Sequence, residues 1–173
     1  MDLNLRNKRA LITGASKGIG LAIAKSLAGE GCHVDLAART EDRLRSAAND
    51  ITDNYNVEVN IHVLDLSNAD DQAKLTNECN NIDILVNNAG SIPRGGLEHI
   101  SDAQLREAWN LKLFGYINIT RDVYANMKKR TSGVIVNVIG SAANNPTYDY
   151  IAGSMANIAL ENFTIALGKE SQI

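Results

Sequence analysis

The segment Arg9–Gly20, with the sequence RALITGASKGIG, constrains the fold of this chain more than any other stretch. Its apolar run, Ala10–Ile12, has the composition of a buried strand and ends in a turn that contains three glycines. Beyond the turn, apolar residues recur at helical intervals, at Ile19, Ile23 and Leu27. The spacing therefore predicts a strand, a tight turn and the start of a helix.

The glycines of this turn have two physical uses. They accept backbone dihedrals that are closed to other residues, and they allow a ligand to approach the backbone closely. A helix that begins near Gly18 would direct its free N–H groups and the positive end of its dipole toward the turn, which suits a pyrophosphate. The segment therefore indicates a nucleotide-binding turn, with a tight strand–helix connection as the structural alternative.

The rest of the chain repeats the alternation of strand and helix. Further strands are predicted at Cys32–Ala38, Val57–Leu64, Ile82–Val86 and Gly133–Ile139. Further helices are predicted from a Thr40 cap to about Thr52, from a Ser67 cap to about Cys79, from a Ser101 capping box to about Lys129, and from Tyr150 to about Lys169. Such alternation implies right-handed crossovers and a parallel sheet, so residues 1–173 are predicted to form one doubly wound α/β domain. Asp35 is an unusual residue for a buried strand.

Composition and charge exclude several classes of function. Apolar residues make up 45% of the chain and charged residues 21%, with a net charge of −3, which excludes a disordered chain and a polyanion binder. There is no basic stripe for nucleic acid, and a weakly acidic surface disfavours anionic membranes. The first residues lack the apolar core of a signal peptide, and no apolar run is long enough to span a membrane, so we expect a cytoplasmic protein.

Cysteines and histidines give no metal-ligand pattern in the sequence. Cys32 and Cys79 lie far apart, which favours reduced, structural thiols. The three histidines, His33, His62 and His99, are scattered. We therefore predict neither a metal site nor a catalytic histidine.

The predicted helix from Ser101 to Lys129 is apolar on two faces. One face carries Leu113, Tyr116, Ile117, Thr120, Tyr124 and Met127, and the other carries Ala108, Leu111, Gly115, Ile119 and Val123. A helix of this kind is covered on two sides. We expect one face to pack on the sheet and the other to contact a second subunit. This predicts a homodimer or homotetramer through the helices around residues 102–129 and 150–169.

A second motif, Asn87-Asn88-Ala89-Gly90, follows directly after the predicted strand Ile82–Val86. Together with the glycine turn, it resembles the short-chain dehydrogenase/reductase family. The glycine spacing departs from the generic G-x-G-x-x-G fingerprint and matches the version of this family. The resemblance covers essentially the whole chain. It implies a Rossmann-type sheet with helices on both faces, and hydride transfer between a nicotinamide dinucleotide and a carbonyl or alcohol.

The end of the second strand bears on the choice of cofactor. Sites for NAD usually place an acid there to bind the ribose 2′-hydroxyl, about 20 residues after the glycines. This chain has Ala38 and Arg39 instead, and Lys17 adds a second cation inside the glycine turn. Two cations suit a 2′-phosphate, so the resemblance implies NADP(H). The alternative is that Arg39 is a solvated residue at the start of a helix.

The resemblance also implies which residues contact the cofactor. Asp65 and Leu66 correspond to the adenine contact, and Asn87 to a residue that stabilises the central sheet. The full cofactor-binding set is Gly14, Ser16, Lys17, Gly18, Ile19, Gly20, Arg39, Asp65, Leu66, Asn88, Ala89 and Gly90.

The catalytic part of the motif is atypical. The family uses a Tyr as general acid and a Lys four residues later, whose charge lowers the phenol pKa from about 10. Here Tyr150 is followed by Ser154 in place of the lysine. The alternative alignment pairs Tyr148 with Ala152 and restores no lysine.

The family serine and asparagine are also displaced or ambiguous. The usual serine aligns with Gly140, and Ser141 follows it, nine residues before Tyr150. Ser141 is predicted either to orient the substrate carbonyl or to be a polar turn residue. Asn110 corresponds to the helix asparagine of the proton relay, with a structural kink as the alternative. The predicted catalytic set is Tyr150, Ser141 and Asn110.

The chain ends at Ile173, whereas family members usually continue through another strand, a substrate-covering segment and a final strand. We therefore expect the domain to be C-terminally incomplete, with the fifth strand as an exposed edge. The leading hypothesis is an NADP-dependent oxidoreductase that acts on a small carbonyl or alcohol. The alternatives are a dinucleotide-binding sensor or scaffold without catalysis, and an inactive fragment.

Overall fold

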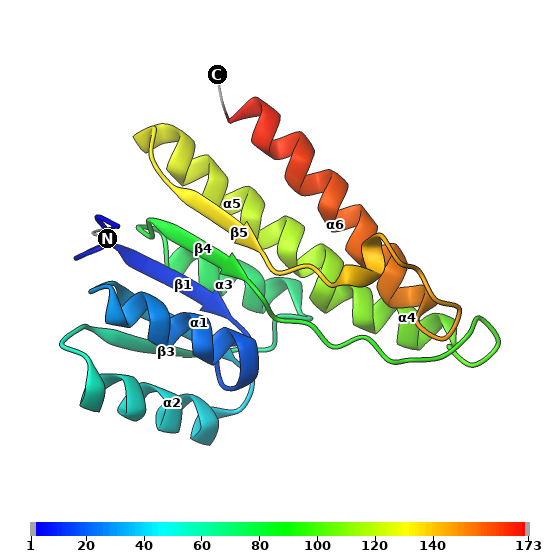
Figure 1. Ribbon diagram of the computed structural model, residues 1–173, viewed down its shortest axis with the longest axis horizontal. Helices are drawn as coiled ribbons and strands as arrows, with labels where there is room; N and C mark the ends of the chain where they lie inside the picture. The colour runs from blue at the N-terminus through cyan, green and yellow to red at the C-terminus, as the bar shows by residue number, and fades with distance from the viewer. Residues whose placement is uncertain (1–2, 172–173) are drawn as a thin grey trace.

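The computed structural model describes residues 3–171, which form a five-stranded parallel sheet with helices on both faces (Figure 1). The strands are β1 (Arg9–Thr13), β2 (His33–Ala38), β3 (Val59–Val63), β4 (Ile84–Asn87) and β5 (Val134–Asn137). The helices are α1 (Gly18–Gly29), α2 (Glu41–Asn54), α3 (Ala69–Glu78), α4 (Asp102–Trp109), α5 (Gly115–Arg130) and α6 (Ile151–Glu170). All five predicted strands and the predicted α/β class are confirmed.

The strand order is β3-β2-β1-β4-β5. The chain moves outward from β1 to β3 and then returns to β4 on the other side of β1. Ala10 of β1 pairs with Val34 of β2 on one side and with Ile84 of β4 on the other. The winding therefore reverses between β1 and β4, and in open α/β sheets ligands bind beyond the carboxyl ends of the strands at this point.

Each face of the sheet has its own apolar core. Because neighbouring residues of a strand point to opposite faces, Ile12 packs with Leu44 and Ile51 of α2, whereas Leu11 packs with the α3 and α5 side. The second core includes Leu75, Leu85, Ile119, Val123 and Met127. Both predicted apolar faces of the long helix therefore contribute buried residues. Among the described helices, none has the length and hydropathy required to cross a bilayer.

The structure corrects two predicted helix caps. Thr40 precedes α2, but its hydroxyl makes no capping hydrogen bond. Helix α3 is capped by Asn68, whose side chain accepts from the Asp70 N–H at 2.8 Å, and not by Ser67. Ser67 instead donates from its N–H and hydroxyl to Asp65. The predicted capping box of Ser101 and Gln104 is confirmed.

The long predicted helix is interrupted where α4 ends. Asn110–Phe114 form a π-helical turn, in which the Gly115 N–H donates to the Asn110 carbonyl, and α5 begins after it. Such a turn adds one residue to the helical repeat and redirects the side chains that it contains.

Within the described residues, β5 lies at an edge of the sheet. Its Val134 and Val136 side chains are exposed, at 55% and 44%. A groove of about 710 Å³ runs beside it, between α5 and α6, and is lined by Met127, Ile135 and Leu167 among others. This matches the expected exposed edge at the fifth strand.

Candidate functional site

The two sequence motifs meet at the carboxyl ends of β1 and β4, where the winding reverses. Gly14 has a positive φ of 66°, and a methyl group in place of its hydrogen would lie 2.9 Å from the Ala89 Cα. A methyl group on Gly20 would lie 2.5 Å from the Gly14 carbonyl oxygen and from the Asn88 amide nitrogen. Gly14 thus lies against the backbone of the Asn88–Gly90 segment, and Gly20 lies against its own turn and the Asn88 side chain, so neither position has room for a Cβ.

Thr13 and Asn88 hold these loops together. The Thr13 hydroxyl accepts from the N–H groups of Asn88 and Ala89, at 2.9 and 3.0 Å. The Asn88 side-chain amide donates to the carbonyl oxygens of Thr13 and Gly14, at 3.0 and 3.3 Å. Asn88 thus supports the glycine turn through its side chain, and its neighbour Ala89 lies against the backbone of Gly14.

Helix α1 starts directly at this turn. Gly18 has a φ of 60°, and a methyl group there would meet nothing within 4 Å. Lys17, Gly18 and Ile19 are exposed, and the N-cap residue Lys17 makes no side-chain capping hydrogen bond. The first N–H groups of α1 therefore have no side-chain cap, and the helix dipole favours an anion at this end. Ser16 lies in the same turn and is half-buried.

Arg39 and Asp65 lie at the carboxyl ends of β2 and β3. Arg39 is exposed at the end of β2, and its guanidinium lies 3.9 Å from the Asp65 carboxylate. Asp65 also accepts from Ser67, and these hydrogen bonds together with the charge of Arg39 hold the pKa of its carboxyl below the usual range despite partial desolvation. The predicted adenine contact Leu66 is buried, at 3% exposure, and belongs to the core. Its carbonyl accepts from the Gln72 side chain at 2.9 Å, so the contact of Leu66 with adenine stays a prediction.

Asn87 is fully buried between strands and helix. Its side-chain amide donates to the Thr120 hydroxyl and to the Asn137 side chain, both at 2.9 Å. Asn137 in turn donates to Thr164 of α6. These contacts agree with the prediction that Asn87 stabilises the central sheet.

The catalytic end of the predicted site is arranged differently from the glycine turn. Tyr150 precedes α6, and the Arg94 guanidinium lies 5.6 Å from the centroid of its ring. A methyl group on Gly153 would lie 2.1 Å from the Tyr150 ring. The ring therefore lies directly on the first turn of α6, at a place that only glycine leaves open. The segment before α6 is joined to the loop that follows β4 by two contacts. One is a β-bridge between Gly95 and Tyr150, and the other is an ion pair between Arg94 and Asp149.

Ser154 stands where the family lysine is expected, and it is buried within α6. Its side chain is 6% exposed, and its hydroxyl donates to the Tyr150 carbonyl at 3.1 Å. Ser154 carries no charge and its hydrogen bond is within its own helix. It therefore cannot act as the missing cation.

The serine position is filled by backbone and by an asparagine. The Gly140 N–H donates to the Asn157 side chain at 3.1 Å, and a methyl group on Gly140 would lie 2.9 Å from the Asn157 amide nitrogen. Ser141 is exposed and begins a 3₁₀ turn, Ser141–Ala143. Its carbonyl accepts from Asn144 and Asn145, which is the geometry of the turn-residue alternative.

Asn110 is exposed and begins the π-helical turn. Asn110 thus lies at an interruption of the helix, as the kink alternative expects, and its role in a proton relay stays a prediction. Two residues later, Lys112 is half-buried and donates to the Val138 carbonyl at 2.9 Å, just beyond β5.

Sequence reasoning missed Lys112. Its Nζ also lies 3.3 Å from the Tyr116 hydroxyl, and its side chain lies against Gly90, where an added methyl would be 2.7 Å from Cδ. Desolvation lowers the pKa of Lys112. The available signal was a lysine inside an apolar helical stretch, between Leu111 and Leu113.

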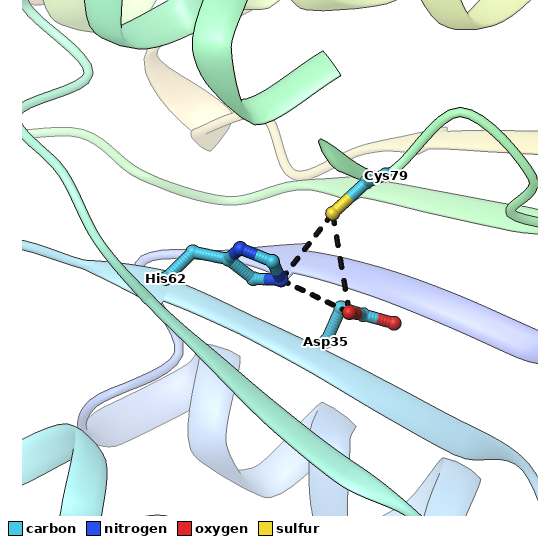
Figure 2. A group of neighbouring side chains, drawn as sticks. All are labelled: Asp35, His62 and Cys79. Carbon is cyan, nitrogen blue, oxygen red and sulfur yellow. Dashed lines mark hydrogen bonds and ion pairs between the residues drawn. The ribbon is translucent and has the colours of Figure 1, made fainter. Parts of the chain in front are cut away.

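A second polar cluster lies on the face of β2 and β3 that α3 covers (Figure 2). His62 Nε2 lies 2.9 Å from the Asp35 carboxylate and 3.3 Å from the Cys79 sulfur. Asp35 also accepts from Arg9 and Asn60, at 3.2 and 3.1 Å. The hydrogen bonds from His62, Asn60 and Arg9 keep the pKa of Asp35 below its usual range although burial opposes this. These contacts explain how a carboxylate is accommodated in the buried strand.

The same cluster brings three potential metal ligands within 4.8 Å of one another, which the sequence spacing did not reveal. The hydrogen bond to Asp35 is the main cause that raises the pKa of His62 to about 10. His62 is therefore an imidazolium at neutral pH, and Glu78 contacts its other nitrogen at 3.0 Å. With Asp35 on one ring nitrogen and Glu78 on the other, His62 is part of a charge network that joins α3 to the sheet.

Known proteins with similar sequences are oxidoreductases. A fatty acyl-CoA reductase from Acinetobacter baylyi is 35% identical over 175 residues, which cover 96% of this chain and 58% of that protein. A 3-oxoacyl-[acyl-carrier-protein] reductase, FabG, from Rickettsia prowazekii is 31% identical, with 91% of this chain and 65% of that protein covered. The chain thus spans about three fifths of the length of these relatives.

Solved structures match along nearly the whole chain. L-sorbose reductase from Gluconobacter frateurii, solved with NADPH and L-sorbose, has a TM-score of 0.93 at 30% identity, covering 98% of this chain and 66% of that one. A metagenomic short-chain oxidoreductase in complex with NADP has a TM-score of 0.92 at 29% identity, covering 97% and 78%. The family model described as short chain dehydrogenase matches residues 8–173. With the glycine turn and the Asn87–Gly90 motif meeting at the reversal of the sheet, this chain belongs to the short-chain dehydrogenase/reductase family.

Proposed function

We propose that this chain is a short-chain oxidoreductase that uses NADP(H) to interconvert a carbonyl and an alcohol. The observation that carries the proposal is the contact between the glycine turn and Asn88–Gly90 at the carboxyl ends of β1 and β4. Backbone amides and an uncapped helix start face outward there, which suits the pyrophosphate of a dinucleotide. The nicotinamide would supply the hydride, while the protein binds and orients the reactants.

The preference for a 2′-phosphate rests on the charges around the end of β2. Arg39 and Lys17 are both exposed cations, and Ala38 ends β2 where an NAD-type site would carry an acid. Arg39 has a weak partner in Asp65, at 3.9 Å with both side chains largely exposed. A phosphate would compete well for this guanidinium, because Arg binds phosphate through two hydrogen bonds. The NADPH and NADP of the two matched structures agree with this choice.

For the proton transfer we propose Tyr150, which precedes α6, as the acid toward the substrate oxygen. Ser141, at the start of the 3₁₀ turn, would orient that oxygen, and Asn110, in the π-helical turn, would hold the proton relay. Arg94 lies over the Tyr150 ring and is paired with Asp149, so it helps to fix the position of the ring. Substituting Tyr150 by Phe is expected to abolish turnover and to leave NADPH affinity within about twofold.

The alternative is a dinucleotide-binding sensor or scaffold without catalysis. The observation that favours it is the burial of the uncharged Ser154 at the lysine position. The Tyr150→Phe variant separates the two functions, since a sensor would lose nothing measurable. A parent chain that binds NADPH but turns over no member of a broad carbonyl panel would support the sensor.

Trp109 allows cofactor binding to be measured directly. It is the single tryptophan, and its indole N–H donates to the Ala152 carbonyl, so it joins α4 to the first turn of α6. We expect NADPH to quench its fluorescence with a Kd at least about tenfold lower than that of NADH, since one phosphate–Arg contact contributes about 1.5 kcal/mol or more. Equal affinities would contradict the assignment of Arg39 and Lys17.

The partner and location predictions remain part of this proposal. Large apolar side chains are exposed on α6 and beside it, at Met155, Ile158, Ile165 and Phe114. Exposed apolar area on the α5 and α6 side supports a homodimer or homotetramer through these helices. Sedimentation equilibrium tests this, and a monomer at high concentration would contradict it. A cytoplasmic location remains a prediction from the sequence.

A further inference from the structure

The proposed reaction needs a positive charge at the end of the site where the hydride and proton are transferred. The family places it on the helix that follows the tyrosine, and in this chain that position is the buried, uncharged Ser154. Arg39 and Lys17 cannot supply it, because they lie beyond β2 and in the turn after β1, at the predicted adenosine and pyrophosphate end. Arg94 lies over the Tyr150 ring, but its guanidinium is paired with the Asp149 carboxylate at 3.0 Å. A cation without a carboxylate partner must therefore come from another element.

Lys112 is placed at that end of the site. It projects from the π-helical turn between α4 and α5, and its Nζ donates to the Val138 carbonyl at 2.9 Å, one residue beyond β5. Its side chain lies against Gly90, three residues beyond β4. Lys112 thus lies between the carboxyl ends of β4 and β5, beside the motif that the proposed function assigns to the cofactor.

The environment of Lys112 is unlike that of the other charged residues. Its amino group lies 3.3 Å from the Tyr116 hydroxyl and 5.0 Å from the centroid of that ring. Burial is the one cause that shifts its pKa, downward, and within residues 3–171 no carboxylate counteracts it. A desolvated lysine without a carboxylate partner is costly for stability, and such groups concentrate at functional sites.

The local backbone is shaped to hold this side chain. The π-helical turn places Lys112 at the third of its five residues, and Gly115 closes the turn onto the Asn110 carbonyl. Gly90 is open on the side of Lys112, since a methyl group there would lie 2.7 Å from the lysine Cδ. The π-helical turn and the absence of a side chain at Gly90 therefore both make room for the Lys112 side chain.

We propose that Lys112, from the π-helical turn, supplies the positive charge that Ser154 cannot supply from α6. This rests on the proposed function. Lys112 would bind the nicotinamide-ribose end of the dinucleotide through its N–H donors and stabilise negative charge on the reacting oxygen. In the reducing direction the carbonyl carbon accepts a hydride, the carbonyl π pair moves to oxygen, and that oxygen takes the proton of Tyr150. Lys112 forms no covalent bond and transfers no electrons.

The experiment compares two ligands that share the adenosine end and differ at the nicotinamide end. NADPH and adenosine 2′,5′-bisphosphate are titrated calorimetrically into the parent chain, Lys112→Met, Lys112→Arg and the exposed-lysine control Lys74→Met. Calorimetry avoids Trp109, which lies close to the substituted position. We expect Lys112→Met to weaken NADPH about tenfold, since a charged hydrogen bond contributes about 1.5–3 kcal/mol. Bisphosphate affinity should change less than about twofold, Lys112→Arg should recover part of the NADPH affinity, and Lys74→Met should match the parent.

The outcomes separate the two proposals. If Lys112→Met binds NADPH as tightly as the parent does, the role of Lys112 is wrong and the proposed function stands. If Lys112→Met weakens both ligands equally, its effect is general and the role is again wrong. If the parent binds neither ligand, both proposals are wrong. Should Lys112→Met fail to fold, Lys112→Gln is judged by the same ratio of the two affinities.

Discussion

The molecule has a nucleotide half, from β1 to β4, and a proposed catalytic half, from α4 to α6. The two halves hold their proposed functional groups in place by different contacts. In the nucleotide half, Thr13 and Gly14 accept three hydrogen bonds from Asn88 and one from the Ala89 N–H. In the catalytic half, Ser154 stands at the position of the family lysine, and its hydroxyl donates to the Tyr150 carbonyl at the start of α6. Gly140 stands at the position of the family serine, and its N–H donates to the Asn157 side chain.

This difference indicates which residues can be exchanged in each half without loss of the proposed function. On the proposed function, phosphate binding would depend on backbone amides of this turn. Gly14 and Gly20 leave no room for a Cβ, so these two glycines cannot be exchanged. The reacting end needs a charge within reach of one oxygen, and a charge can arrive from any element that borders the site. On our proposal, the cation has moved from α6 to the π-helical turn while the nucleotide half has kept its geometry.

The largest effect is expected from Gly20→Ala in the nucleotide half. The added methyl would lie 2.5 Å from the Gly14 carbonyl oxygen and from the Asn88 amide nitrogen, and the Gly14 backbone has no freedom to move away. Thermal unfolding should show a loss of about 2–4 kcal/mol, in the range of other overpacked or unpaired buried groups. NADPH binding should become undetectable.

Gly168→Ala is the matched control for this prediction. Gly168 lies within α6, and a methyl group there would meet nothing within 4 Å. Alanine in a helix is expected to stabilise the chain by up to about 1 kcal/mol over glycine.

The outcome for Gly20→Ala that would contradict the account is retained NADPH binding. It would show that the glycine turn and the Asn88–Gly90 segment are not in contact as described.

The next effect concerns the charge network that holds α3 to the sheet. His62→Gln removes the cation between Asp35 and Glu78, but Arg9 and Asn60 still satisfy Asp35. We expect a loss of about 2 kcal/mol at pH 6, less than for a buried charge left without any partner. His99→Gln, at an exposed position, is the control.

The pH dependence gives this prediction its sign. The pKa of His62 is raised to about 10 in the folded chain from 6.5, so its stabilising effect is complete below pH 6.5 and is lost as the pH rises toward 10. The difference in unfolding free energy between the parent and His62→Gln should therefore shrink across that window. A difference that grows with pH, or a rise in Tm with Zn²⁺ at pH 6, would indicate a neutral, metal-binding histidine.

Arg39→Ala tests the adenosine end of the nucleotide half. We expect NADPH affinity to fall about tenfold and NADH affinity to change less than about twofold, because only NADPH carries the 2′-phosphate. Arg45→Ala, which removes an exposed pair with Glu41 on α2, is the control. A parallel loss of both affinities would place Arg39 outside the phosphate site.

The smallest effect is expected from Ser154→Ala in the catalytic half. Its hydroxyl bonds only within α6, so the loss should stay within about 1 kcal/mol in unfolding and turnover should be nearly unchanged. A large loss of turnover would show that Ser154 takes part in the reaction and would weaken the case for Lys112.

Most of the fold was predictable because its signals are local. The Arg9–Gly20 segment carries its own strand, turn and helix start, and the Ser101 capping box needs only Gln104. The position of the cap on α3 was wrong by one residue because Ser67 has a competing partner in Asp65. Local sequence therefore predicts whether a segment is a helix or a strand better than it predicts the residue at which that element begins or ends.

The catalytic half was less predictable because its contacts join distant segments. Lys112 acquires its surroundings from Gly90 and Val138, which lie more than twenty residues away on either side. The π-helical turn that redirects it has no distinct residue pattern. The environment of Asp35 likewise comes from Arg9 and His62, and only the assembled sheet brings these together.

The central claim is that the turn from Gly14 to Gly20 and the segment Asn88–Gly90 together bind a phosphorylated nicotinamide dinucleotide. Amide hydrogen exchange with and without saturating NADPH tests it most directly, because the proposed contacts are backbone N–H groups. The account predicts slower exchange in both segments and little change in the outer helix α2. Unchanged exchange in the glycine turn, or protection confined to another part of the chain, would contradict it.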